Sequence, residues 1–274
     1  MSKIRNKLLF ILAIIATIGF GGAFLYNAYL FVRYQIDARS IIEDQAAIQN
    51  IFAEQLEFVM ANPSGGTPAQ LPGTSDAQAQ EEFISPLSIV REMTGNQDII
   101  AYLHIEGTNI SNVVLQYSDN FFYLRHDVHR ASNVNGSLFL DYANSPDFSD
   151  RNSIIYGHNM RNGTMFHDLR HFVDFDYFRA NRYITVITDE KLLTYEVFAA
   201  FSARIYFEYI QVSFHDDDDF LSLLNELQSR SIHNSDISLS ASDRILILST
   251  CTNTAQDMRF VVAAVLQHTQ YIVN

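Results

Sequence analysis

Cysteine and positive charge are both scarce in this chain. One cysteine occurs among 274 residues, and 18 basic residues stand against 31 acidic ones. A single cysteine excludes an intramolecular disulfide, and the sequence has no C-x-x-C pair or other zinc-type spacing. The formal net charge of -13 argues against nucleic acid as a partner. Cys251 is therefore either an inert structural residue, which is the default for a lone cysteine, or a reactive one.

Cys251 lies between two apolar segments near the end of the chain. The β-branched run 245–248 is typical of a buried strand, polar residues follow from Thr252 to Asp257, and a second apolar run begins at Phe260. This pattern predicts a hairpin with Cys251 at the end of one strand and Arg259 at the start of the next. A nearby guanidinium favours a thiolate, or holds a carbonyl oxygen that gains charge.

The N-terminal segment has the features of a membrane anchor. Lys3, Arg5 and Lys7 precede an apolar run over residues 8–32, which is long enough to span a bilayer as a helix. No A-x-A-like cleavage site follows closely, so we expect a retained signal-anchor over residues 1–32. The basic cluster before the span predicts a cytoplasmic N-terminus and an extracellular remainder.

Composition divides the remainder into three parts. Residues 33–60 have apolar positions at helical spacing and predict a helical stalk. Residues 61–80 are rich in proline, glycine and small polar residues, which is typical of a flexible linker. A globular domain is expected over residues 81–274.

Many short strands with a few helices between them predict a β-barrel or sandwich with helical insertions. The acidic run 216–219 is interpreted as a helix N-terminus rather than a calcium loop. A short helix or strand is expected at 121–124. The other predicted strands are 99–105, 113–116, 137–140, 153–156, 183–188 and 191–200, and the predicted helices are 83–93, 165–172 and 219–228.

A cysteine nucleophile needs a partner that exchanges protons near neutral pH. Among nine histidines, His158 is distinctive because it follows the predicted strand 153–156 through Gly157 alone. Gly157 would leave room for the backbone or a ligand to approach closely. By this pattern alone, His158 is one candidate among the nine.

Two segments resemble the histidine and cysteine–arginine motifs of sortases. They are SIIYGHNMRNGTMF at 153–166 and ILILSTCTNTAQDMRFVVAAVL at 245–266. Residues 96–124 resemble the opening strands of that family, and NGSLFLDYANSP at 135–146 and the insertion 214–234 resemble class B. The family often has tryptophan where Tyr102 stands, whereas this sequence contains none.

The resemblance implies a fold and an activity. The fold would be a mainly β, closed barrel of about eight strands with N-terminal helices and a helical insertion. The activity would be cell-wall transpeptidation without metal or cofactor on the outer face of a Gram-positive membrane. Cys251 would attack a threonine carbonyl, His158 would protonate the departing amine, and Arg259 would bind the developing oxyanion.

The resemblance also implies substrates and partners. Family substrate contacts fall on Asn120, Leu124, Tyr156, Ile210 and Ser249, each of which could instead have a packing role. The partners would be surface proteins that carry a sorting signal, and an amine acceptor on a peptidoglycan precursor or, alternatively, a pilin lysine. A cysteine protease and an anchored binding module are further alternatives, and the full histidine, cysteine and arginine set argues against the module.

Overall fold

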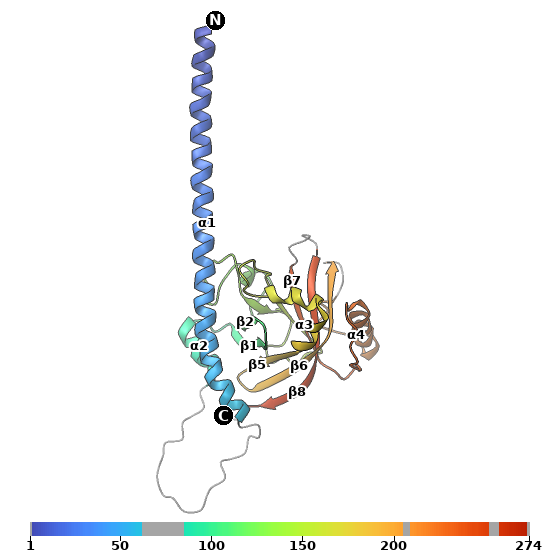
Figure 1. Ribbon diagram of the computed structural model, residues 1–274. Coiled ribbons are helices and arrows are strands. Elements are labelled where there is room, and N and C mark those ends of the chain that lie inside the picture. Colours follow the sequence, from blue (N-terminus) through green and yellow to red (C-terminus); the bar gives the residue numbers. More distant parts are fainter. Residues whose placement is uncertain (1, 62–84, 205–208, 252–257, 273–274) are drawn as a thin grey trace, which may run out of the picture. The chain divides into compact units, whose positions relative to one another are not determined.

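The computed structural model describes residues 2–61, 85–204, 209–251 and 258–272 (Figure 1). The chain divides into two compact units, Met1–Ile41 and Ile42–Asn274. Residues 62–80 of the expected linker lie outside the described residues.

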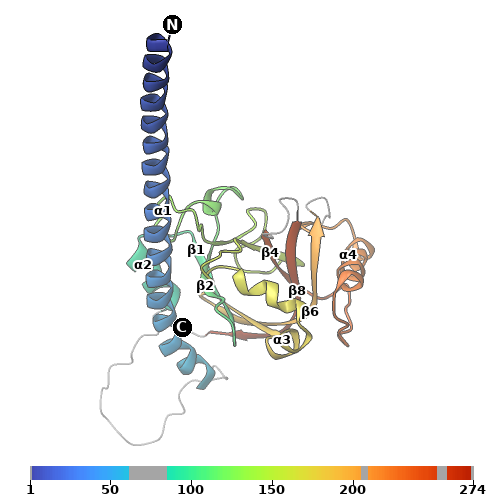
Figure 2. The same ribbon diagram turned by 45° about the horizontal axis from the view of Figure 1, so that its top comes forward.

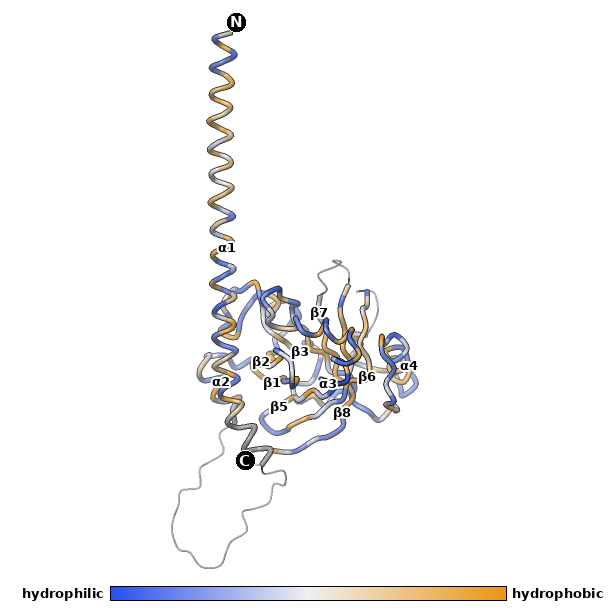
Figure 3. The backbone as a smooth tube through the Cα atoms, in the orientation of Figure 1, coloured by the Kyte–Doolittle hydropathy of each residue, from blue (hydrophilic) through white to orange (hydrophobic). Residues whose placement is uncertain are grey.

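The first unit is the N-terminal part of helix α1 (Ser2–Ala61). The expected anchor and stalk form this single continuous helix, in keeping with the absence of proline from the whole segment. Figure 3 shows that hydrophobic residues dominate the N-terminal part of α1. The apolar side chains there are exposed, and the helix is long and apolar enough to cross a membrane.

The second unit contains a closed β-barrel in which some neighbouring strands are antiparallel and others parallel. This barrel confirms the predicted mainly β fold class. Within the described residues, eight strands follow one another around the barrel in the order β1-β2-β3-β4-β7-β8-β6-β5. The strands are β1 (Ile99–Ile105), β2 (Ser111–Leu115), β3 (Leu138–Leu140), β4 (Asn152–Gly157), β5 (Tyr183–Ile187), β6 (Lys191–Arg204), β7 (Ile245–Cys251) and β8 (Met258–Tyr271).

The first four residues of strand β7 are buried on both faces, which explains their unbroken apolar sequence. Ile245 and Ile247 pack in a hydrophobic cluster with helix α4 (Asp217–Arg230). Leu246 and Leu248 are equally buried, and the pleat turns them to the opposite face of the strand. Both sets of side chains therefore stabilise the strand that ends at Cys251.

Helix α4 covers one outer face of the barrel. It lies beside β6 in both views of the molecule (Figures 1 and 2). Its buried residues Phe220 and Leu224 lie in one cluster with Phe198 of β6 and Val261 of β8. The Asp216 side chain accepts a hydrogen bond from the Asp219 amide, which confirms the predicted capping role of the acidic run.

Another hydrophobic cluster joins the barrel to the C-terminal part of α1 and to α2 (Pro86–Thr94). The ring of Phe52, from α1, stacks on Tyr102 of β1 with ring centroids 3.8 Å apart. The Tyr102 hydroxyl hydrogen-bonds Ser111 Oγ, and burial raises the pKa of Tyr102. Tyr102 thus combines an aromatic packing surface with a satisfied polar group at the position where tryptophan is often found.

The remaining helices are short. The segment expected at 121–124 is a 3-10 helix, η1 (Phe122–Leu124), and the one expected at 165–172 is the 3-10 helix η2 (His167–Val173). Helix α3 (Phe175–Ala180), which directly follows η2, was not predicted from the sequence. Asp174 caps α3 by accepting a hydrogen bond from the Tyr177 amide.

A polar clamp holds α2 to the β5–β6 hairpin. Arg91 donates two hydrogen bonds to the Asp189 carboxylate, at 3.2 and 2.8 Å, and a third to Ile99 O at 2.7 Å. Ser85 Oγ donates to Asp189 Oδ1 at 2.6 Å. Burial would raise the pKa of Asp189, but the bonds from Arg91 and Ser85 outweigh it and hold that pKa below its ordinary value.

We expect Asp189→Asn to lower the free energy of unfolding near neutral pH by about 1 kcal/mol or less, because surface ion pairs are screened by solvent. The lowered pKa means that the carboxylate stabilises the fold above its unfolded-state pKa. This contribution is lost as the pH falls through the folded-state value. Urea unfolding of both proteins should therefore show a stability gap that narrows in acid. If the difference in free energy of unfolding between the two proteins stayed constant with pH, the Asp189 carboxylate would not stabilise the fold through the polar clamp.

Candidate active site

Three neighbouring strands bring the predicted catalytic positions to one level of the barrel. Parallel strands β4 and β7 pair Gly157 with Thr250, so the next position along each strand aligns His158 with Cys251. Antiparallel strands β7 and β8 pair Cys251 with Arg259. The predicted hairpin is thus confirmed, and the backbones of the three residues converge although they are far apart in the sequence. The Cys251 side chain lies outside the described part of the chain.

The backbone of η1 orients the half-buried imidazole of His158. Its Nε2 lies 2.8 Å from the carbonyl oxygen of Leu124. A carbonyl oxygen can only accept a hydrogen bond, so Nε2 carries a proton in this geometry. A neutral His158 therefore presents Nδ1 as its acceptor, and the imidazolium form carries its second proton there.

Local interactions keep the Leu124 carbonyl in place. Asp119 Oδ1 accepts hydrogen bonds of 2.8 Å from the amides of both Phe121 and Phe122, which starts the turn of η1. Gly136 runs so close to η1 that a Cβ atom there would lie 2.8 Å from Leu124 O, and its φ is 59°. Glycine at this position therefore permits the loop to support the carbonyl that binds His158.

The space beside Gly157 is filled by protein rather than left open. A Cβ atom on Gly157 would lie 2.3 Å from Leu138 Cδ2 and 2.7 Å from Phe166 Cδ2. The Phe166 amide donates to the His158 carbonyl at 2.9 Å. Two side chains, rather than the backbone or ligand that we expected, thus approach Gly157, and the packing of Leu138 and Phe166 fixes the end of β4.

Arg259 is half-buried at the start of β8. Its Nη1 donates to the Met258 carbonyl at 3.2 Å, which engages one of the five N–H donors of the guanidinium group. Its charge also acts on Tyr156: burial and Asp141 raise the pKa of that phenol, and Arg259 opposes them. The guanidinium is therefore part of the same electrostatic environment as Tyr156.

Asp141 is a residue of the candidate site that was not predicted from the sequence. Its buried Oδ2 accepts hydrogen bonds from Asn120 Nδ2 at 2.8 Å and from the Tyr156 hydroxyl at 2.9 Å. Asn120 Oδ1 in turn accepts from the Tyr142 amide at 3.0 Å. Asp141 therefore joins two of the predicted substrate contacts. It belongs to NGSLFLDYANSP, but nothing in that segment indicates which distant side chains it binds.

The other predicted substrate contacts differ in accessibility. Ile210 is 47% exposed and Leu124 is half-buried, so both have surface that a ligand could cover. Ser249 is 2% exposed, and its Oγ lies 2.8 Å from the Tyr209 hydroxyl. The Ser249 hydroxyl therefore has a partner inside the protein. That partner, Tyr209, directly precedes Ile210 in the sequence.

Comparisons with known proteins agree with this architecture. Residues 103–267 match the model of the sortase domain. The chain is 39% identical to sortase B of Listeria monocytogenes over 158 residues, which are 57% of this chain and 63% of that protein. The chain thus spans less than two thirds of the length of that relative.

Two solved structures share the fold. The X-ray structure of Clostridium perfringens sortase B has a TM-score of 0.62 and 35% identity, and the match covers 66% of this chain and 99% of that one. The Staphylococcus aureus sortase B–substrate complex has a TM-score of 0.65 and 27% identity, and the match covers 82% of this chain and 98% of that one. With the domain match, the barrel and the relatives in agreement, the chain belongs to the sortase family, and within it to class B.

Proposed function

We propose that the protein is a cysteine transpeptidase that cleaves a C-terminal sorting signal after threonine and transfers the acyl group to an amine of a peptidoglycan precursor. The observation that carries this proposal is the alignment of three residues at neighbouring strands: His158 directly after β4, Cys251 at the end of β7 and Arg259 near the start of β8. Membership of the sortase family supports the same reaction class.

In the first half-reaction, the Cys251 thiolate attacks the carbonyl carbon of the threonine residue. Arg259 donates hydrogen bonds to the oxyanion that forms, and its planar donor fork suits this task. The C–N bond then breaks, and the departing amine takes a proton from His158. Because Nε2 is engaged by Leu124 O, Nδ1 is the atom of His158 that exchanges this proton.

In the second half-reaction, an amine attacks the thioester carbonyl, the C–S bond breaks, and Cys251 leaves as thiolate. His158 accepts the proton that the attacking amine loses. The net reaction exchanges one amide for another and needs no external oxidant or reductant. A pilin lysine remains the alternative acceptor. A peptidoglycan precursor and a lysine side chain would both attack the thioester through a primary amino group.

Asn120, Tyr156, Leu124, Ile210 and Ser249 are the proposed substrate-binding residues. Asp141 supports this proposal because its hydrogen bonds hold the Asn120 amide and the Tyr156 phenol in one orientation. Leu124 and Ile210 would contribute apolar surface. Ser249 would act through Tyr209, since its own hydroxyl is buried.

We also propose that the exposed apolar part of α1 anchors the protein in the cell membrane, with residues 1–32 as the cytoplasmic tip and transmembrane segment. Residues 33–60 would serve as the stalk, 61–80 as the linker and 81–274 as the extracellular catalytic domain. The exposed apolar surface of the first unit and the preceding Lys3, Arg5 and Lys7 support this arrangement.

The function is tested with a panel of fluorogenic sorting-signal peptides, incubated with and without amine acceptors and read by mass spectrometry. We expect cleavage after threonine and an amide product whose mass includes the acceptor amine. Cys251→Ala should form no acyl-enzyme. A product from water alone, at an undiminished rate in the presence of amines, would indicate a protease instead. Comparing a peptidoglycan-type amine with a lysine peptide distinguishes the two acceptors.

Arg259→Lys keeps the charge but removes the planar donor fork. We expect kcat/KM to fall roughly a hundredfold, which corresponds to about 3 kcal/mol of barrier for one lost oxyanion donor. Arg179→Lys is the matched control, because Arg179 is exposed on α3. Steady-state kinetics with the best peptide measure both variants. Turnover of Arg259→Lys close to that of the unmodified protein would contradict the oxyanion role.

The topology is tested by adding protease to intact protoplasts. We expect loss of the domain that follows the linker, because it is proposed to lie outside the membrane. A cytoplasmic protein followed in the same sample should stay intact, which controls for lysis. Protection of the domain until the protoplasts are permeabilised would reverse the proposed orientation.

A further inference from the structure

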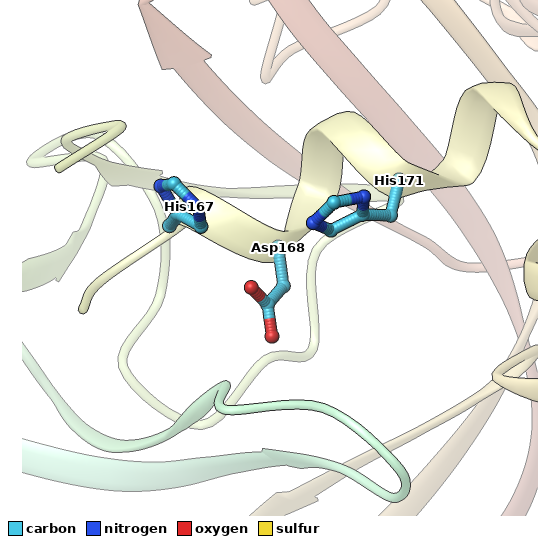
Figure 4. Close-up of side chains that lie close together, drawn as sticks. All are labelled: His167, Asp168 and His171. Carbon is cyan, nitrogen blue, oxygen red and sulfur yellow. The ribbon is translucent and has the colours of Figure 1, made fainter. Parts of the chain in front are cut away.

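Helix η2 carries a cluster of potential metal ligands on the side chains of His167, Asp168 and His171. One ligand atom from each side chain lies within 4.8 Å of the other two. Figure 4 shows Asp168 between the two imidazoles along the helix. In a 3-10 helix, residues three apart eclipse one another, so the backbone itself brings Asp168 and His171 together.

The carboxylate of Asp168 is oriented by the turn between β1 and β2. Asp168 is 7% exposed, and its Oδ2 accepts hydrogen bonds from the Asn109 amide at 2.8 Å and from Asn109 Nδ2 at 3.0 Å. Because both bonds end on Oδ2, they orient the group without occupying Oδ1. Hydrogen bonds of this kind to a ligating carboxylate are typical of metal sites.

The cluster also contains an unsatisfied polar atom and adjoins an accessible hollow. The Nδ1 atom of His167 is buried and has no hydrogen-bond partner in the part of the chain that the structure describes, although buried ring nitrogens normally have one. A surface hollow of about 500 Å³ is lined by Asp168 and His171, with Gly107, Thr108, Asn109 and Tyr177 around them. An ion can therefore reach Asp168 and His171 from solvent.

We propose that His167, Asp168 and His171 bind a divalent transition metal ion of the zinc type. Two imidazoles and one carboxylate form a ligand set that zinc accepts, and imidazole ligands argue against calcium or magnesium. Three protein ligands leave the fourth tetrahedral position to water or an external ligand on the side of the hollow.

The observed spacing requires only a small closure of the cluster. Zinc–ligand distances of about 2.1 Å in a tetrahedron imply ligand atoms roughly 3.4 Å apart. His171 is exposed, so its ring can rotate toward the other two ligands without disturbing the core. A bound ion would thus tie His171 to the first two residues of η2, and Asp168 would link the ion to the β1–β2 turn.

Metal binding at this site would also stiffen the segment that leads from His158. Phe166 immediately precedes η2, packs beside Gly157 and donates its amide hydrogen to the His158 carbonyl. The ion would therefore stabilise the folded state by binding it in preference to the unfolded chain. This site is separate from the proposed nucleophile, so its test does not depend on the transpeptidase reaction.

The experiment uses the full chain in detergent, without a polyhistidine tag, in a Cys251→Ala background that removes the thiol as a zinc ligand. Isothermal titration calorimetry with Zn²⁺ measures affinity and stoichiometry, and thermal unfolding measures stabilisation. His167→Ala and His171→Ala each remove one ligand. His215→Ala is the matched control, because His215 is exposed beside Asp216 and lies outside the cluster.

We expect one Zn²⁺ per chain and a raised midpoint of thermal unfolding. Each ligand variant should weaken binding by at least about tenfold, while the His215→Ala control binds normally. The midpoint of thermal unfolding in metal-free buffer is compared between each variant and the parent Cys251→Ala protein. Equal midpoints would show that the variants fold. Failure of the parent to bind Zn²⁺, or equal affinity in all four proteins, would overturn the proposal.

Discussion

The parallel pairing of β4 with β7 is the constraint on which the candidate active site depends. Two parallel neighbours end at the same edge of a sheet, so the residues at their ends meet without any long side chain or loop. The register from Asn152↔Ile245 to Gly157↔Thr250 brings His158 level with Cys251. The antiparallel partner β8 adds Arg259 to the same level. A shift of one residue in either pairing would send alternate side chains to the opposite face of the sheet.

Packing around the barrel protects this register. Helix α4 covers β6, β7 and β8 on one side, while Phe52 and α2 cover β1 on another. Closer to the site, Asp119 and Gly136 hold the Leu124 carbonyl against His158, and Asp141 orients Asn120 and Tyr156. Backbone turns and buried carboxylates thus orient the polar groups of the candidate site within the protein itself.

Much of the secondary structure could be predicted because local patterns decide it. The β-branched run at β7, the turn residues between β5 and β6 and the amphipathic α4 all gave elements close to those observed. Helix α3 was missed because its six residues are too few for a clear helical period, and the Asp174 cap is its main local signal. The stalk helix was expected, but its packing through Phe52 onto Tyr102 involves residues fifty positions apart and has no local signature.

The sequence by itself determined the family, because the ordered motifs are local properties of the chain. Strand patterns predicted a β-barrel or sandwich, and the resemblance to the family implied the closed barrel and the candidate residues. Pattern alone left His158 as one of nine histidines, and only the resemblance singled it out. The tertiary structure decided that the Leu124 carbonyl orients His158 through Nε2. It also decided that Asp141 connects Asn120 with Tyr156. The cluster of His167, Asp168 and His171 beside Asn109 likewise appears only in three dimensions. These facts depend on strand register and on close approach between distant segments, and neither is encoded in the spacing of residues along the chain.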